Sequence, residues 1–251
     1  MIESITKAFN AYSKGPFLFV WASIMYIILL IASLFAAFGM AVAYFIALSV
    51  LNKEMVIGSI PTLAVFGIIA LLFIFFGGGL NAALAKAYRS AYWKEKMSLT
   101  KFYGYALEKA PEMFGIQLVR ELLWVLLAGP GIAIYIYMLK GIEFMDILFY
   151  AYIVFVTFMI HMIFTPAFIS AGAFGMNLFS SMRHAFEFLR KRHVFFIAMF
   201  ALFAVLWFLN FIPILQFITI FFAYPVLYTA LIIMMEDAIK IKEEESDAEG
   251  I

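Results

Sequence analysis

The sequence predicts an all-α integral membrane protein with six transmembrane helices, arranged as three repeats of an interfacial amphipathic helix and a transmembrane hairpin. Of the 251 residues, 67% are hydrophobic and 13% are charged, whereas soluble domains hold about 45–50% apolar and about 25% charged residues. Long uncharged stretches, such as residues 17–51, exceed the roughly 20 apolar residues that a spanning helix needs. The composition therefore excludes a soluble globular fold.

A short half-polar segment that occurs three times indicates the repeats. Its copies start at Ser4, Ser98 and Asn177, and a long apolar run follows each of them. Within the copies, apolar residues recur at spacings of three and four, which is typical of a helix lying on a membrane surface. Repetition of this kind indicates a repeated architecture. The three repeats are expected at about residues 1–95, 96–176 and 177–240.

The first repeat begins with an amphipathic helix at residues 2–14. Gly15 and Pro16 separate this helix from the first span, because proline is tolerated in a first helical turn. The uncharged run that follows is too long for one crossing and too short for two with a loop. Residues 39–51 therefore either bend along the far interface or continue a tilted helix. In the second span, three consecutive glycines at 77–79 loosen the helix.

The second and third repeats follow the same plan. In the second, the amphipathic segment covers residues 98–110, and Pro111 takes the place of Pro16. A Gly-Pro-Gly string interrupts the third span, so residues 129–139 either span, bend or re-enter the membrane. In the third repeat, the amphipathic segment covers residues 177–189. The six spans are expected at about residues 17–38, 61–82, 113–139, 147–171, 194–211 and 214–235.

Residues 1–240 are expected to form a single membrane domain, followed by an acidic tail at 241–251. The tail is rich in Glu and Asp and lacks apolar periodicity. Such a segment buries too little apolar surface to offset the entropy of ordering it. We therefore expect it to be disordered.

The basic residues predict the orientation of the chain. Of its 17 Lys and Arg residues, only Lys53 and Lys140 lie in the turns on one side, and Arg120 lies within a span. Lys and Arg of short loops stay on the cytoplasmic side. We therefore expect a multi-pass protein of the cytoplasmic membrane, with both termini and the three amphipathic helices in the cytoplasm.

Arg120, Glu121 and His161 form a candidate intramembrane polar site. A charge inside a span costs roughly 2.5–3.5 kcal/mol on insertion scales, so it is a functional candidate by default. Neighbouring helical residues point about 100° apart, so we expect Arg120 and Glu121 not to pair well with each other. One hypothesis has Glu121 meeting His161 while Arg120 reaches toward lipid phosphate. The alternative has Arg120 extending to the interface and Glu121 pairing structurally with a neighbour.

A basic edge near the third amphipathic segment is a candidate site for lipid head groups. It contains Arg183, Arg190, Lys191 and Arg192. Basic residues near an anionic membrane surface contribute about 1 kcal/mol each to lipid binding. The alternative is that these residues only anchor the topology of the chain.

Several classes of function find no support in the residues. The chain has no cysteine, which excludes disulfides and thiolate chemistry. It also lacks the His-Glu-x-x-His, Gly-x-Ser-x-Gly and P-loop motifs of common enzymes. A net charge of +1 gives no bias toward nucleic acid. We therefore expect no enzyme, no metal, no cofactor and no nucleic-acid partner.

The alternation of amphipathic segment and hairpin, with the string Leu-Phe-Ser-Ser-Met-Arg-His-Ala-Phe-Glu-Phe-Leu at 178–189, resembles a known kind of membrane domain. Six-span domains of similar layout are attached to some glycerophosphoryl diester phosphodiesterases and occur in stand-alone prokaryotic relatives. The likeness covers residues 1–240 in layout. It implies a small polytopic membrane protein and carries over neither phosphodiesterase activity nor any site residue.

The leading expectation is a non-enzymatic polytopic membrane protein that acts as a lipid-interacting or scaffold module at the inner leaflet. Its partners would be membrane lipids, with a protein partner or a second copy of the chain as further candidates. The alternative is a small transporter or channel that uses Arg120, Glu121 and His161.

Overall fold

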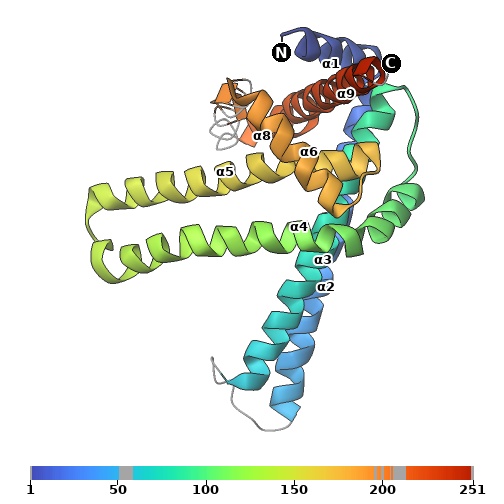
Figure 1. The fold of residues 1–251 in the computed structure, drawn as a ribbon. Coiled ribbons are helices and arrows are strands. Elements are labelled where there is room, and N and C mark those ends of the chain that lie inside the picture. Colours follow the sequence, from blue (N-terminus) through green and yellow to red (C-terminus); the bar gives the residue numbers. More distant parts are fainter. Residues whose placement is uncertain are drawn as a thin grey trace.

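The structure is a computed structural model that describes residues 2–50, 59–194, 197–198, 201–203, 205 and 213–249 (Figure 1). Every regular element within these residues is helical, which confirms the predicted all-α class. The helices are α1 (Ile2–Lys14), α2 (Pro16–Val50), α3 (Ile60–Tyr92), α4 (Leu99–Ile134), α5 (Glu143–Phe174), α6 (Leu178–Lys191), α8 (Pro213–Ile218) and α9 (Tyr224–Glu249). The π-helical turns η1 (Tyr135–Leu139) and η2 (Thr219–Ala223) follow α4 and precede α9.

Five helical segments of the described residues are long and apolar enough to cross a membrane. They are Pro16–Val50, Ile60–Tyr92, Leu99–Leu139, Phe144–Phe174 and Leu215–Ile239. The chain therefore has the character of a multi-pass membrane protein. Most of the span expected at 194–211 lies outside the described residues, so a total of six spans stays a prediction.

Two stretches whose path the sequence leaves open are helical. Residues 39–50 continue α2 as one helix, which is about 50 Å long at 1.5 Å per residue. A helix of that length crosses a hydrocarbon core of about 30 Å only when it is tilted or extends beyond it. Residues 129–139 continue α4 and then pass into η1.

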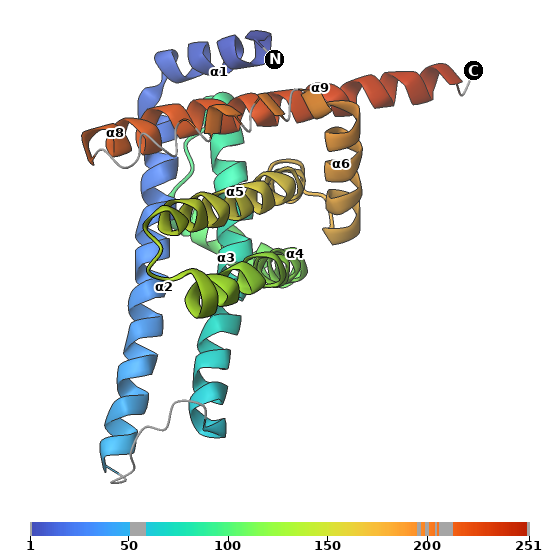
Figure 2. The ribbon, with the colours of Figure 1, turned by 90° about the vertical axis from the view of Figure 1, so that its left-hand side faces the viewer.

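The helices form two hairpins that run in different directions. Figures 1 and 2 show α2 beside α3, and α4 beside α5. The α4–α5 pair runs across the direction of the α2–α3 pair. Spanning helices tilt from the membrane normal by up to about 40°. For both hairpins to cross one flat bilayer, they must therefore turn toward each other about the contact where α3 meets α4 and α5.

Small residues let the backbones approach closely at that contact. A Cβ atom added to Gly79 would overlap the carbonyl oxygen of Ala106 in α4, and one added to Gly172 in α5 would overlap that of Ala82 in α3. Membrane helices use small residues in this way because lipid-exposed helices gain little from burying apolar side chains against each other. The glycines at 77–79 do not loosen α3, which passes through them as one continuous helix.

The three half-polar segments fold differently. The first and third form the separate helices α1 and α6. The second is the beginning of α4, because Pro111 lies inside that helix and does not end it. Figure 1 shows the first turns of α4, at the right of the view, bending away from the rest, and an internal proline is the usual cause of such a bend.

The main core lies where most of the helices converge. Phe19 of α2, Tyr88 of α3, Phe102 of α4, Ile169 of α5 and Ile232 of α9 are all fully or almost fully buried in one cluster. The far halves of the hairpins instead carry exposed large apolar side chains. Those halves have the surface that lipid would cover.

Helix α1 packs lengthwise against α9. Ala8 forms a buried cluster with Val226, Ala230 and Ile233, in the segment that the sequence assigns to the sixth span. Helix α9 then continues to Glu249, so the chain is helical over most of the tail at 241–251, for which the sequence predicts disorder. The placement of α1 on a membrane surface stays a prediction.

Candidate functional site

Arg120 and Glu121 pair directly with each other, so the prediction that these neighbours would pair poorly is wrong. The Nη2 atom of Arg120 lies 2.7 Å from Oε1 of Glu121, and Nε lies 3.2 Å from the same oxygen. The prediction considered only the directions of the Cα–Cβ bonds. The Arg side chain is long enough to bend around the helix, and its fork of N–H donors matches a carboxylate.

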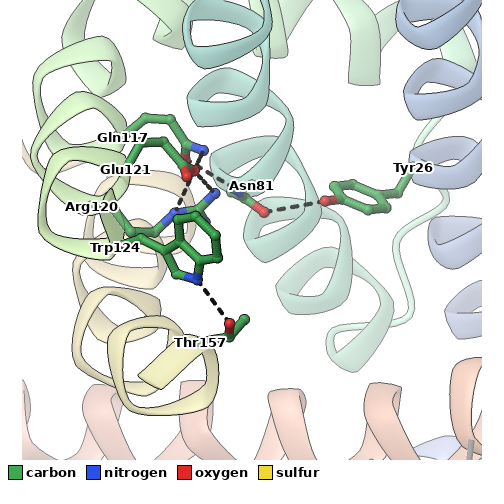
Figure 3. A network of polar contacts seen from close by, with 7 residues as sticks. All are labelled: Tyr26, Asn81, Gln117, Arg120, Glu121, Trp124 and Thr157. Atoms are coloured by element: carbon green, nitrogen blue, oxygen red, sulfur yellow. Dashed lines mark hydrogen bonds and ion pairs between the residues drawn. The ribbon is translucent and has the colours of Figure 1, made fainter. Parts of the chain in front are cut away.

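The ion pair is the end of a hydrogen-bonded chain that crosses three helices (Figure 3). Gln117 donates from Nε2 to Oε1 of Glu121 over 2.9 Å. Asn81 of α3 donates from Nδ2 to Oε1 of Gln117 over 3.4 Å, and Tyr26 of α2 donates to Oδ1 of Asn81 over 3.4 Å. The bond between Asn81 and Gln117 links α3 to α4. Nothing in the sequence singles out Tyr26.

The surroundings of the pair are largely protein. The side chain of Arg120 is 12% exposed, and its guanidinium carbon lies 5.6 Å from the ring centre of Phe168. The side chain of Glu121 is more open, at 37%. A paired and hydrogen-bonded charge avoids most of the cost of burial, so the arrangement accounts for two charges inside an apolar helix.

His161 does not join the ion pair. Within the described residues, Glu121 is hydrogen bonded by Arg120 and Gln117 and not by His161. Instead, the His161 side chain lines a cavity of about 500 Å³ between α5 and α9. Thr157 lines the same cavity and accepts a 2.8 Å hydrogen bond from Nε1 of Trp124 (Figure 3). Trp124 lies about one helical turn after Glu121 in α4, so the cavity and the polar chain lie next to each other.

A second cavity of about 250 Å³ adjoins the first. Thr219 and Tyr224 line both. The second cavity is also lined by Tyr26 and by Tyr88, whose hydroxyl lies 2.8 Å from Oγ of Ser23. The sequence does not predict either cavity, because residues from α2, α3, α5, η2 and α9, together with Phe203, form them.

The predicted basic edge lies on and just after α6. Arg183 is 80% exposed and donates to Glu187, one turn further on, over 3.0 Å. Arg190, Lys191 and Arg192 are exposed as well. The inner face of α6 packs against α5, where Oγ of buried Ser170 lies 2.8 Å from Nδ1 of His184.

The outer face of α6 combines these charges with exposed rings. Phe179 is 83% exposed and Phe186 is 57% exposed. Together with Arg183 and Arg190 they stand at spacings of four, three and four residues, which places all of them on one side of the helix. We call these four residues the α6 stripe. The sequence prediction included its arginines and missed its phenylalanines.

The described part of the chain contains no group of three or more His, Cys, Asp or Glu residues that could hold a metal ion. No protein-family model, no curated protein and no solved structure matches the chain. The resemblance to the six-span membrane domains is therefore untested and stays an expectation.

Proposed function

We propose that the protein is a non-enzymatic membrane module that binds anionic lipid head groups on the cytoplasmic side through α6. The α6 stripe carries this proposal. Its two arginines and two phenylalanines lie on the exposed side of a helix whose other side is buried against α5.

The chemistry of the stripe suits a bilayer interface. Aromatic rings favour the level of the head groups, and a guanidinium binds a phosphate through two parallel hydrogen bonds. Lys191 and Arg192 extend the positive charge just beyond the stripe. Each basic residue near an anionic surface contributes about 1 kcal/mol, so four of them retain lipid strongly even when the aromatic contribution is ignored.

The proposal is tested by the lipid that stays bound to the purified protein. A variant with Arg183, Arg190, Lys191 and Arg192 all changed to Gln is compared with one in which four exposed lysines elsewhere are changed to Gln. The control lysines are Lys14, Lys94, Lys96 and Lys101. Both variants lose four positive charges, so the comparison separates position from net charge.

The expected result is that the α6 variant retains at least tenfold less phosphatidylglycerol than wild type by native mass spectrometry, while the control variant retains as much as wild type. Equal loss of lipid in both variants would mean that lipid retention depends on net charge and not on the position of the charges in α6. No loss of lipid in either variant would mean that the basic residues of α6 only anchor the topology of the chain.

The rival function, a small transporter or channel that uses Arg120, Glu121 and His161, has less support. Such a function needs the three residues to face one pathway. Arg120 and Glu121 instead neutralise each other within the polar chain, while His161 lines a cavity that neither of them lines.

A further inference from the structure

We propose that the cavity between α5 and α9 binds an uncharged amphiphile whose head carries carbonyl oxygens. This site is separate from the α6 stripe, so the proposal goes beyond lipid head-group binding. It rests on three properties of the cavity: its shape, the absence of charge among its lining residues, and hydrogen-bond donors without partners.

The cavity is elongated and mostly apolar. Along α5 its lining runs from Tyr150 to Thr165, a rise of about 22 Å at 1.5 Å per residue. Its volume of about 500 Å³ lies within the usual range of ligand sites. No Asp, Glu, Lys or Arg is among its lining residues, and an unpaired charge in such surroundings would be costly. An uncharged ligand with an apolar chain fits these walls.

Aromatic rings form one side of the cavity. Phe203 lies 6.3 Å from the ring centre of Phe158 and 5.8 Å from that of Tyr224, which in turn lies 5.5 Å from Tyr228. Rings at these distances give a continuous aromatic surface. Such a surface packs well against either a flat ring or a methylene chain.

Besides Tyr150, which is 66% exposed, three polar side chains of the lining have no hydrogen-bond partner among the residues that the structure describes. Tyr228 is only 3% exposed, yet its hydroxyl forms no bond to another described residue. The hydroxyl of half-buried Tyr224 and the ring of His161, which is an exposed residue, likewise have no bond to a described residue. Because the polar groups of buried residues almost always have a partner, the hydroxyl of buried Tyr228 is the group for which a ligand is most expected. In the adjoining cavity, by contrast, Tyr26 and Tyr88 are both hydrogen bonded.

The open groups are suited to a ligand that accepts hydrogen bonds. Each tyrosine hydroxyl can donate one hydrogen bond, and a neutral histidine ring can donate one more. A carbonyl or ester oxygen accepts such bonds without bringing a charge into the cavity. Two kinds of membrane amphiphile have this chemistry: quinones with an apolar tail, and diacylglycerols.

The test is direct binding to the full-length protein in detergent micelles, measured by equilibrium dialysis. The probes are a benzoquinone with a decyl tail, dioctanoylglycerol, and decanoate as a charged amphiphile of similar length. Saturable binding of the quinone or of dioctanoylglycerol at one molecule per chain supports the proposal. The probe that binds saturably shows which of the two kinds of amphiphile supplies the carbonyl oxygens. Absence of saturable binding by both, or decanoate binding as tightly as either, would overturn it.

Tyr228→Phe removes one hydroxyl and should weaken binding of the saturating probe about fivefold, the usual contribution of one hydrogen bond. Tyr137→Phe is the matched control, because Tyr137 is 86% exposed and does not line the cavity; its affinity should equal that of wild type. Val154→Trp fills the cavity and should abolish binding, with helicity and gel-filtration profile as checks on folding. Wild-type affinity in Tyr228→Phe contradicts the proposed site even if the tryptophan variant fails to fold.

Discussion

The hairpin α2–α3 and the hairpin α4–α5 are similar in length and apolar character but differ in their polar content. The far half of α2–α3 is joined by one small group of hydroxyls, in which Tyr44 lies 2.8 Å and Ser59 2.9 Å from Oγ1 of Thr62. The hairpin α4–α5 contains the Arg120–Glu121 ion pair as well as hydrogen bonds between its two helices. Hydropathy alone does not separate the two hairpins.

The difference indicates that the two hairpins have different roles. Close backbone packing joins α3 to α4 and α5, and the surface of the first hairpin is largely left for lipid. The second hairpin supplies Gln117, Arg120 and Glu121 of the polar chain. Its helix α5 provides one wall of the larger cavity. Chemistry within the membrane should therefore depend on α4 and α5 far more than on α2.

The largest effect is expected at the glycine contact between the hairpins. Gly172→Ala places a methyl group against the backbone of Ala82 and should lower the free energy of unfolding by about 3 kcal/mol, the upper range for overpacking. Gly67→Ala is the control, since a Cβ there meets open space in the same helix that contains Ala82. It should stabilise the protein by up to about 1 kcal/mol. Thermal unfolding in detergent measures both, and equal stability of the two variants would contradict the predicted contact.

The ion pair should give the next effect. Glu121→Met leaves the guanidinium of Arg120 without its carboxylate, and breaking a buried pair in this way costs about 3–5 kcal/mol at full burial. Because Glu121 is 37% exposed, we expect about 2 kcal/mol. Changing both residues to Met should restore most of that loss. Denaturant unfolding distinguishes the cases, and a double variant no more stable than Glu121→Met would contradict an unpaired guanidinium as the cause of the loss.

A smaller effect is expected at the hydrogen bond between α4 and α5. Trp124→Phe and Thr157→Val each remove the 2.8 Å bond, and interhelical bonds in membrane proteins contribute about 0.6 kcal/mol on average. The double variant should lose less than the sum of the two single losses, because both remove the same interaction. Strict additivity in this cycle would mean that the bond contributes nothing.

The smallest effect should occur outside both hairpins, in α1. A hydrogen bond from the Lys7 ammonium, together with its charge, lowers the pKa of Glu3 below the usual 4.5. Stability from this pair is therefore present above pH 4.5 and is lost as the pH falls through the lowered pKa of Glu3. Both side chains are exposed, so the change should be slight and should vanish in high salt. The melting temperature of wild type and Glu3→Gln between pH 3 and 7 measures it, and a difference that persists in 1 M salt would contradict a surface ion pair.

Local signals made several elements predictable from the sequence. Gly15 and Pro16 end one helix and begin the next, and Gly175 adopts a left-handed conformation with φ of 70° where α5 ends. Asn177 accepts a hydrogen bond from the backbone N–H of Ser180 and so caps α6. Each of these residues affects only the backbone within a few positions of it, so the local sequence alone specifies where the helix begins or ends.

Other features depend on tertiary structure. Pro111 removes one backbone donor, and packing of α4 on α3 keeps the helix continuous across it. The Arg120–Glu121 pair depends on side-chain rotamers that a helical projection does not contain. The cavity beside His161 requires α9 and η2 to lie next to α5, and no periodicity in either segment encodes that arrangement.

Placement of the α6 stripe at a bilayer surface is the central claim, and spin labels test it most directly. Because the chain has no cysteine, Phe179→Cys and Phe186→Cys each carry a single label, with Lys101→Cys as an exposed reference. In nanodiscs that contain phosphatidylglycerol, we expect both stripe labels to collide more often with dissolved oxygen than with a water-soluble nickel chelate. Collision frequencies that match those of the reference label would place the stripe in water and contradict the account.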